Sequence, residues 1–354
     1  MSGRELSRRF HASVVSPLLN GIPHAAALLG EGSEVLGFDD DVSPDHDFGP
    51  RCQVYVAADD IPAARAALDG LPEEFEGLVV RYARTDGSAG HQVEVTTPRD
   101  FFTARLAVDP ADGMSLADWL LTPTQRFATL ADGPVFADPD GALAARQDAL
   151  RWYPEDVWRY ALAAAWLRVG QEEAFVGRTG GRGDELGSAI LGARLTRELV
   201  RLAFLVERRW APYAKWLGTA FRALPIAARL GPLLDETLHA RDWRSREAAL
   251  VRAGAVLAEA TNALGLAEAV DPEPHRFHTR DIRVIGGERF TEALAPAITD
   301  PEVRALLERL GSRSDRPVGR LVGTIDQAAD SSDVLANTDR FRAARAMLGL
   351  LPES

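Results

Sequence analysis

The hydrophobic pattern of this chain changes near residue 151, and this change constrains the fold more than any other feature. Before it, apolar residues occur in short alternating runs such as "CQVYVA" and "HQVEVTT", which are typical of half-buried strands. After it, they recur at the spacing of amphipathic helices (Leu186, Ile190, Leu195, Leu199, Leu202 and Val206). The sequence therefore predicts an α/β domain, with a small mixed sheet and flanking helices, followed by an all-α helical bundle.

A chain of 354 residues is long enough for two domains, which we expect at residues 1–148 and 149–354. In the first we predict helices at about 5–28 and 61–71, and strands in "DHDF", "CQVYVA", "LVVRYAR", "HQVEVTT" and "ADGPVFADPDG". In the second we predict helices at about 154–175, 186–206, 214–223, 244–264, 288–297, 300–310 and 338–349.

Composition and charge exclude several classes of protein. A net charge of −12 argues against extended contact with nucleic acid, because such contact depends on neutralising many phosphates. No run approaches the ~20 apolar residues of a membrane span, and the N-terminus has no apolar signal segment. Cys52 is the only cysteine, which excludes an internal disulfide and a thiolate zinc site. We therefore expect a cytoplasmic protein without membrane partners.

Three nucleotide-binding and hydrolase motifs are missing. Lys215, the only lysine, stands in "PYAKWL" and not in a Walker A loop. The Gly-x-Gly pairs at Gly30/Gly32 and Gly181/Gly183 lack the third glycine of a dinucleotide fingerprint. The chain also has no Gly-x-Ser-x-Gly elbow.

The acidic stretch "GEGSEVLGFDDDVSPDHDFGPR" at residues 30–51 has three interpretations: a solvated loop, a calcium site or an enzyme's metal site. A calcium loop that begins at Asp41 would need glycine and glutamate where His46 and Cys52 stand, so calcium is excluded. In a strand, Asp45 and Asp47 would project from one face, ~6–7 Å apart, and both could reach magnesium. The acids lie between turn formers and lead into an apolar run, which favours the enzyme over the loop.

Glu94 in "HQVEVTT" is a candidate third carboxylate. Strand alternation places Val93 and Val95 on one face, and Glu94 on the other with Gln92 and Thr96. A carboxylate in a valine-rich strand is costly to bury unless its face is wet or carries a cation. The alternative is an exposed face of an edge strand.

These residues together resemble the signature of the polymerase-beta-like nucleotidyltransferase superfamily. Gly32-Ser33, eleven further residues, Asp45-His46-Asp47-Phe48 and a later strand bearing Glu94 occur in the order of that signature. His46 departs from it, because the pattern prefers an apolar residue there. The stretches "WYPEDVWRY", "GDELGSAILGARLTRELVRLAFLVERR" and "PYAKWLGTAF" extend the likeness to about residue 221. They resemble an uncharacterised two-domain branch, distantly similar to aminoglycoside and lincosamide nucleotidyltransferases.

The resemblance implies a magnesium-dependent enzyme with a nucleotidyltransferase-like first domain. Asp45 and Asp47 would hold two Mg²⁺ ions, and Glu94 would hold the ion nearer the acceptor. The turn at Gly32 and Ser33 would bind the phosphates of the nucleotide through backbone N–H groups and the serine hydroxyl. The helical domain would close over the cleft that holds the nucleotide and the acceptor.

Further residues are candidates for the same site. Arg51 is expected to bind phosphate or to form an ordinary surface ion pair, with equal weight. By the resemblance, Lys215 and Tyr213 would reach the triphosphate; the alternative is a surface lysine. The candidates for a general base are four acids, each of which could instead be a charge at a helix end (Glu172, Glu173, Asp184 and Glu185).

Two other groups of residues are given structural interpretations. His275 and His278 lie beside Pro272 and Pro274, which favours a loop, and no third metal ligand is evident. The tryptophans of the second domain are expected to be core and helix-packing residues (Trp152, Trp158, Trp166 and Trp210).

The sequence therefore predicts a nucleotidyltransferase that transfers a nucleoside monophosphate from a nucleoside triphosphate to a hydroxyl group, with release of pyrophosphate. The acceptor is expected to be a small molecule. The alternatives are a protein or transfer-RNA acceptor, and an inactive nucleotide-binding or interaction module on the same fold. The sequence leaves open which nucleoside triphosphate is used, which molecule is the acceptor and which residue is the general base. It also leaves open whether a homodimer forms.

Overall fold

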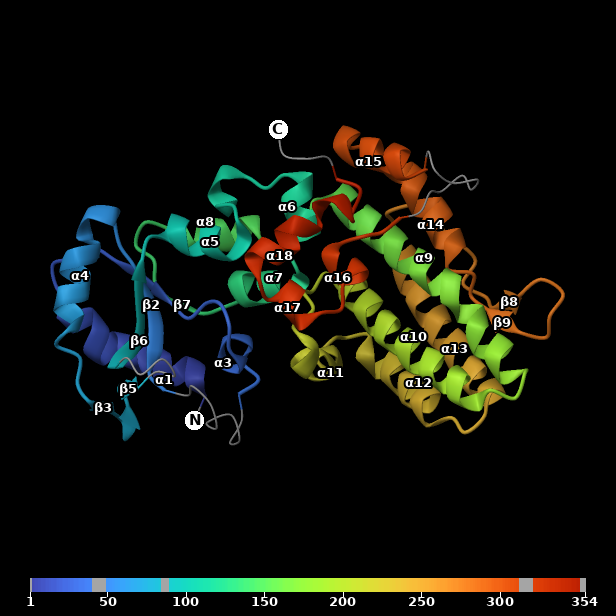
Figure 1. The fold of residues 1–354 in the computed structure, drawn as a ribbon, viewed down its shortest axis with the longest axis horizontal. Helices are drawn as coiled ribbons and strands as arrows, with labels where there is room; N and C mark the ends of the chain where they lie inside the picture. The colour runs from blue at the N-terminus through green and yellow to red at the C-terminus, as the bar shows by residue number, and fades with distance from the viewer. Residues whose placement is uncertain (1, 40–48, 84–88, 312–320, 351–354) are drawn as a thin grey trace. The chain divides into compact units, whose positions relative to one another are not determined.

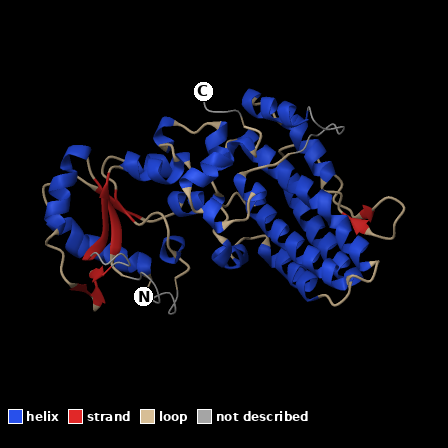
Figure 2. Ribbon diagram, viewed as in Figure 1, coloured by secondary structure: helices blue, strands red, loops and turns tan. Residues whose placement is uncertain are grey.

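The structure, a computed structural model, describes residues 2–39, 49–83, 89–311 and 321–350 (Figure 1). The chain divides into two compact units, one of Met1–Met114 and Gln125–Arg151, the other of Ser115–Thr124 and Trp152–Ser354. The first unit is mixed α/β, and the second is helical in its described residues apart from one short hairpin (Figure 2), which confirms the expected combination. The assignment of residues 1–148 as a catalytic domain, and of residues 149–354 as a domain that closes over its cleft, stays a prediction.

A five-stranded mixed sheet organises the first unit, with strand order β5-β6-β2-β1-β7. Strand β2 is parallel to β6 and antiparallel to β1, and the outer pairs are antiparallel. The strands are β1 (Ala25–Ala27), β2 (Arg51–Tyr55), β5 (Arg81–Ala83), β6 (Ala89–Thr96) and β7 (Val135–Ala137). A separate hairpin pairs β3 (Glu74–Phe75) with β4 (Leu78–Val79). The expected strand "DHDF" falls in residues 45–48, outside the described ranges.

Strand alternation gives the sheet one apolar face and one partly polar face. Cys52 and Val54 of β2 join Val93 and Val95 of β6 in the core. The N-terminal helices and α4 (Ile61–Leu68) pack on this face. Gln53 lies opposite Glu94 in the parallel register, on the other face. The alternation predicted for "HQVEVTT" is therefore the one observed.

The helices that follow β6 lie within residues 98–149, where the pattern predicted none. Thr97 caps α5 by accepting a hydrogen bond from Asp100 N at 3.0 Å. Ser115 and Asp118 form a reciprocal capping box at the start of α6. The bounds are α5 (Pro98–Leu106), α6 (Leu116–Leu121), α7 (Thr124–Ala131) and α8 (Ala142–Ala149).

The N-terminal helix is shorter than the expected range of about 5–28. It runs as α1 (Gly3–Phe10), a π-helical turn (His11–Val15) and α2 (Ser16–Leu18). Gly21 has φ +87° and is followed by Ile22-Pro23, which prevents the helix from continuing. The alanines that looked helical form β1 instead, because they pair with β2 in the centre of the sheet.

The second unit is built on long helices that pack side by side. The longest are α9 (Glu155–Gly180), α10 (Glu185–Val206) and α13 (Trp243–Ala263). Trp166 of α9 stacks on Phe290 at a centroid distance of 4.3 Å and donates to Thr261 Oγ1 at 3.1 Å. The other helices are α11 (Ala214–Arg222), α12 (Ala227–His239), α14 (Glu288–Leu294), α15 (Pro301–Gly311), α16 (Ile325–Ala328), α17 (Ser332–Leu335) and α18 (Thr338–Ala343).

Several elements of this unit were not predicted, among them α12 and a short hairpin. Helix α12 contains Gly231 and Pro232, which weaken the helical signal in its sequence. The segment with His275 and His278 was expected to be a loop, but β8 (His275–Arg276) pairs there with β9 (Arg283–Val284). Among the described residues no helix is both long and apolar enough to cross a membrane.

Candidate functional site

The turn after β1 brings Gly32 and Ser33 to the end of the sheet where β2 begins. Ala27, the last residue of β1, lies opposite Gln53 of β2. The Gln53 side chain accepts a hydrogen bond from Leu29 N at 2.8 Å, which fixes the chain as it leaves β1. Gly32 then precedes the short helix α3 (Ser33–Leu36).

Gly32 occupies a position that only glycine fits. Its φ and ψ are 137° and 144°, a conformation that residues with a Cβ avoid. A Cβ built there would overlap Arg51 Nη2 and lie 2.7 Å from the carboxylate oxygens of Glu34. The turn is therefore shaped by close approach as well as by backbone conformation.

Arg51, at the start of β2, is bound to this turn. Its Nε donates to Glu34 Oε1 at 2.6 Å and its Nη2 donates to the Glu31 carbonyl oxygen at 2.5 Å. The side chain is only 20% exposed. In this structure Arg51 thus makes the ion pair that was one of its two expected roles, and phosphate binding stays a prediction.

Glu94 projects from β6 on the same face as Gln53. Its side chain is 43% exposed, and Arg105 Nη2 lies 3.1 Å from its Oε2. The Arg105 guanidinium also stacks on Phe101, 3.6 Å from the ring centroid, so α5 holds the arginine in place. A Cβ built at Gly30 would lie 3.2 Å from Arg105 Nε. The Glu94–Arg105 ion pair therefore lies next to the glycine turn.

Glu31 and Arg126 form a third acid–arginine pair at the turn. Arg126, on α7, is buried, and its Nη1 pairs with Glu31 Oε1. Burial raises the pKa of Glu31, but the charges of Arg126 and Arg105 oppose it, and the net shift is downward. The glycine turn thus carries three guanidinium groups, each neutralised by a glutamate.

Sequence reasoning singled out Gly32, Ser33, Arg51 and Glu94 but missed Arg105 and Arg126. Both arginines come from helices that the pattern did not predict, and arginine is common along this chain. Asp45 and Asp47 lie in residues 40–48, outside the described ranges. Within the described residues, no group of three or more metal-binding side chains occurs.

Tyr213 and Lys215 lie at the start of α11 in the second unit. Tyr213 OH accepts a hydrogen bond from Trp216 Nε1 at 2.7 Å. Lys215 is exposed, and its Nζ lies 4.9 Å from the centroid of the Trp216 ring. Their contact with a triphosphate stays a prediction.

Two candidates for a general base, Glu172 and Glu173, lie on α9. Glu172 Oε2 pairs with Arg194 Nε at 2.8 Å. Glu173 accepts hydrogen bonds from three successive backbone N–H groups, those of Ile285 at 2.6 Å and of Gly286 and Gly287 at 2.9 Å. Burial raises the pKa of Glu173 to about 7, against the opposing effect of these N–H groups.

The other two candidates, Asp184 and Glu185, lie at the start of α10. Asp184 caps the helix by accepting a hydrogen bond from Gly187 N at 2.7 Å. Glu185 accepts from Trp243 N at 3.2 Å and pairs with Arg246 at 3.3 Å. These contacts match the expected alternative of charges at a helix end, and the role of a base stays a prediction.

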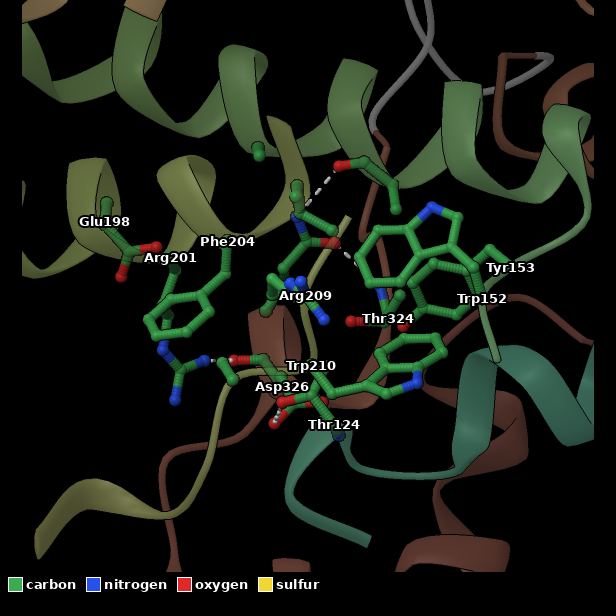
Figure 3. Close-up of a pocket in the computed structure, with 15 residues that line it drawn as sticks. Thr124, Trp152, Tyr153, Glu198, Arg201, Phe204, Arg209, Trp210, Thr324 and Asp326 are labelled. Carbon is green, nitrogen blue, oxygen red and sulfur yellow. Dashed lines mark hydrogen bonds between the residues drawn. The ribbon is translucent and has the colours of Figure 1, made fainter. Parts of the chain in front are cut away.

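The four tryptophans expected to be packing residues divide into two groups. Trp158 and Trp166 are fully buried between helices, as predicted for packing residues. Trp152 and Trp210 also pack, with ring centroids 4.4 Å apart, but they line a hollow in the surface of this unit (Figure 3).

Comparison with known proteins gives one partial family match. The model of a family described as a domain of unknown function (DUF4037) matches residues 119–217, less than half of the chain. No curated protein matches the chain. Among solved structures, a nucleotidyltransferase-like protein from Exiguobacterium sibiricum 255-15 is similar, with 14% identity. The match covers 77% of this chain and 82% of that one, with a TM-score of 0.33, too low to carry an argument.

Proposed function

We propose that this protein is a Mg²⁺-dependent nucleotidyltransferase that transfers a nucleoside monophosphate to a hydroxyl group of a small molecule. The observation that supports this most is the position of Glu94 relative to β2. The Asp45-x-Asp47 pair ends four residues before β2, and β6 runs parallel to β2 with Glu94 opposite Gln53. The glycine turn joins the same end of β2, as a phosphate-binding turn next to the acids would require.

The expected donor set of Asp45, Asp47 and Glu94 consists of carboxylates, and of these the structure describes Glu94. Carboxylate oxygens are the ligands that Mg²⁺ prefers, and it uses one or two of them together with substrate phosphates. Glu94 is open to solvent on one side, and Arg105 is the ion-pair partner seen for it among the described residues. Bound Mg²⁺ would offset the charge of the triphosphate and of the leaving pyrophosphate.

The chain's own residues would mainly bind and orient the substrates. Backbone N–H groups at Gly32 and Ser33 would bind phosphate oxygens. The guanidinium groups near the turn would bind phosphate only by exchanging their glutamate partners for it (Arg51, Arg105 and Arg126). The acceptor oxygen would attack the α-phosphorus while the bond to the bridging β-phosphate oxygen breaks, and pyrophosphate would leave. The acceptor proton would pass to a base or to water, and Glu172, Glu173, Asp184 and Glu185 remain the candidates for that base.

The test is a transfer assay with the full chain. The protein would be incubated with Mg²⁺, an extract of small metabolites and each of the four nucleoside triphosphates, labelled at the α-phosphate. We expect label on an acceptor with the wild type, and a loss of 10²-fold or more with Asp47→Asn or Glu94→Gln, on the order of the loss of one transition-state contact. Glu74→Gln, an exposed acid of the small hairpin, is the matched control and should leave transfer unchanged.

The other outcomes separate the alternatives. Label on a protein or on transfer RNA would replace the small-molecule acceptor, although the net charge of −12 argues against RNA. Nucleotide binding without transfer in any extract would establish an inactive binding module. Absence of binding for all four triphosphates in Mg²⁺ would refute the proposed site.

A further inference from the structure

The hollow lined by Trp152 and Trp210 lies within the helical unit. It has a volume of about 490 Å³, counted with the open space at its mouth. Side chains reach it from α9 and α10, from the segment between α10 and α11, and from the start of α16 (Figure 3). Hollows with a mainly apolar lining and a few polar groups are where proteins bind small molecules.

Aromatic rings form one wall of the hollow. Trp152 and Trp210 are tilted by 36° with centroids 4.4 Å apart, and Tyr153 meets Trp210 edge to face at 4.6 Å. Figure 3 shows these three rings grouped together, with Phe204 on the opposite side of the view. Flat rings that are already fixed by one another offer contact area to a planar ligand with little loss of conformational entropy.

The acidic groups of the hollow are already neutralised or hydrogen-bonded. Glu198 pairs with Arg168 at 3.2 Å. The half-buried carboxylate of Asp326 accepts hydrogen bonds from Thr124 N at 2.8 Å and from Thr124 Oγ1 at 3.2 Å. Neither carboxylate therefore needs a cationic ligand.

The basic groups have unused donors. Arg201 donates through Nη1 to the Asp326 backbone oxygen, but its buried Nε has no partner. The exposed Arg209 guanidinium makes no hydrogen bond or ion pair with the described part of the chain. Two guanidinium groups thus reach a hollow whose acids are satisfied, and an oxyanion is the group that would bind them.

We propose that this hollow binds a small planar aromatic oxyanion, with its ring against Trp152 and Trp210 and its anionic group on Arg209 and Arg201. A carboxylate and a phosphate share this chemistry. A cationic ligand, which aromatic walls can also hold, is disfavoured because both guanidinium groups would repel it.

Isothermal titration of the full chain with four probes tests the proposal. Benzoate and phenyl phosphate carry both the ring and the oxyanion, benzamide lacks the charge, and cyclohexanecarboxylate lacks the aromatic ring. We expect one or both of the first two to bind at least tenfold more tightly than the last two. The tighter of benzoate and phenyl phosphate identifies the source of the oxyanion.

Three variants locate the binding. Arg209→Gln should weaken the preferred probe about tenfold or more, as expected for the loss of a charge-assisted hydrogen bond, and Arg209→Lys should retain part of the affinity. Arg280→Gln, an exposed arginine beyond β8, is the matched control and should bind like the wild type. Both substituted side chains are at the surface, so the fold should be preserved.

The proposal is wrong if benzamide binds as tightly as benzoate and phenyl phosphate, or if none of the four probes binds. Equal weakening by Arg209→Gln and Arg280→Gln would also overturn it, because the effect would then come from overall charge.

Discussion

At the scale of single residues, Gly32 shows how a backbone conformation and a side-chain contact together fix one amino acid. The Arg51 guanidinium lies where a Cβ would project, and the same guanidinium holds Glu34 and the carbonyl of Glu31. The turn and the first acid–arginine pair are therefore one arrangement.

We predict that Gly32→Ala lowers the free energy of unfolding by at least about 2 kcal/mol, from backbone strain and displacement of Arg51. Denaturant unfolding measures it. The matched control is Gly77→Ala, at φ +79° with nothing within 4 Å of its Cβ, which should cost only about 1 kcal/mol for the left-handed conformation. Equal losses would show that Arg51 moves aside without cost.

His11 is a second residue whose environment makes a measurable prediction. Its ring is buried against Phe136, and burial together with the neighbouring His24 lowers its pKa to about 4. The unfolded chain, with a histidine pKa near 6.5, then binds a proton that the folded chain does not. The contribution of His11 to the free energy of unfolding is therefore complete above pH 6.5 and is lost as the pH falls toward 4.

We predict that this residue alone lowers the free energy of unfolding by about 2 kcal/mol between pH 7 and pH 5. The measurement is the pH dependence of urea unfolding, compared between wild type and His11→Gln, which should remove that part of the slope. His239→Gln, at an exposed site, should leave the slope unchanged. If His11→Gln keeps the wild-type pH dependence of the free energy of unfolding, that dependence comes from other groups.

At the scale of elements, Glu173 fastens α9 to the segment that leads from β9 into α14. Its carboxylate accepts hydrogen bonds from three successive backbone N–H groups. One side chain therefore supplies acceptors for the backbone donors of this bend. Because its pKa is raised to about 7, its contribution to stability falls as the pH rises from about 4.5 to 7. This sign is opposite to that of His11.

We predict that Glu173→Ala leaves these N–H groups without their acceptor and lowers the free energy of unfolding by about 3 kcal/mol. Hydrogen exchange should then accelerate at residues 285–287 before it changes in α10 or α13. Glu172→Ala is the matched control, because Glu172 pairs with Arg194 and does not contact the bend. Unchanged exchange at residues 285–287 in Glu173→Ala would contradict the assignment.

At the scale of the whole molecule, the charge distribution limits the partners. The chain has 40 basic and 52 acidic residues, and many of its arginines are held in ion pairs with acids. Few cations are therefore left to displace counterions from a nucleic acid.

We predict no measurable retention of transfer RNA or duplex DNA by the full chain at about 50 mM salt, where electrostatic binding is favoured. Filter binding measures this, with a basic nucleic-acid-binding protein as the positive control. Retention that weakens steeply as salt rises would reveal a basic groove and would return transfer RNA to the candidate acceptors.

The fold could be predicted where one physical signal dominated. Alternating apolar residues fixed β2 and β6, and helical spacing fixed α9, α10 and α13. Prediction failed where a contact from elsewhere in the chain decided the outcome, as in β1. Its alanines favour helix in isolation and become a strand because β2 and β7 supply hydrogen bonds on both edges.

The candidate site divides in the same way. The sequence by itself determined the order of Gly32, Ser33 and Glu94 and the strand face on which Glu94 lies, because these follow from local spacing and from the alternation of a strand. Only the tertiary structure decided that Arg105 and Arg126 meet the glycine turn, and that Trp152 and Trp210 line a hollow with Arg209. Those contacts join distant segments, and their geometry depends on how helices pack, which no local pattern in the sequence specifies.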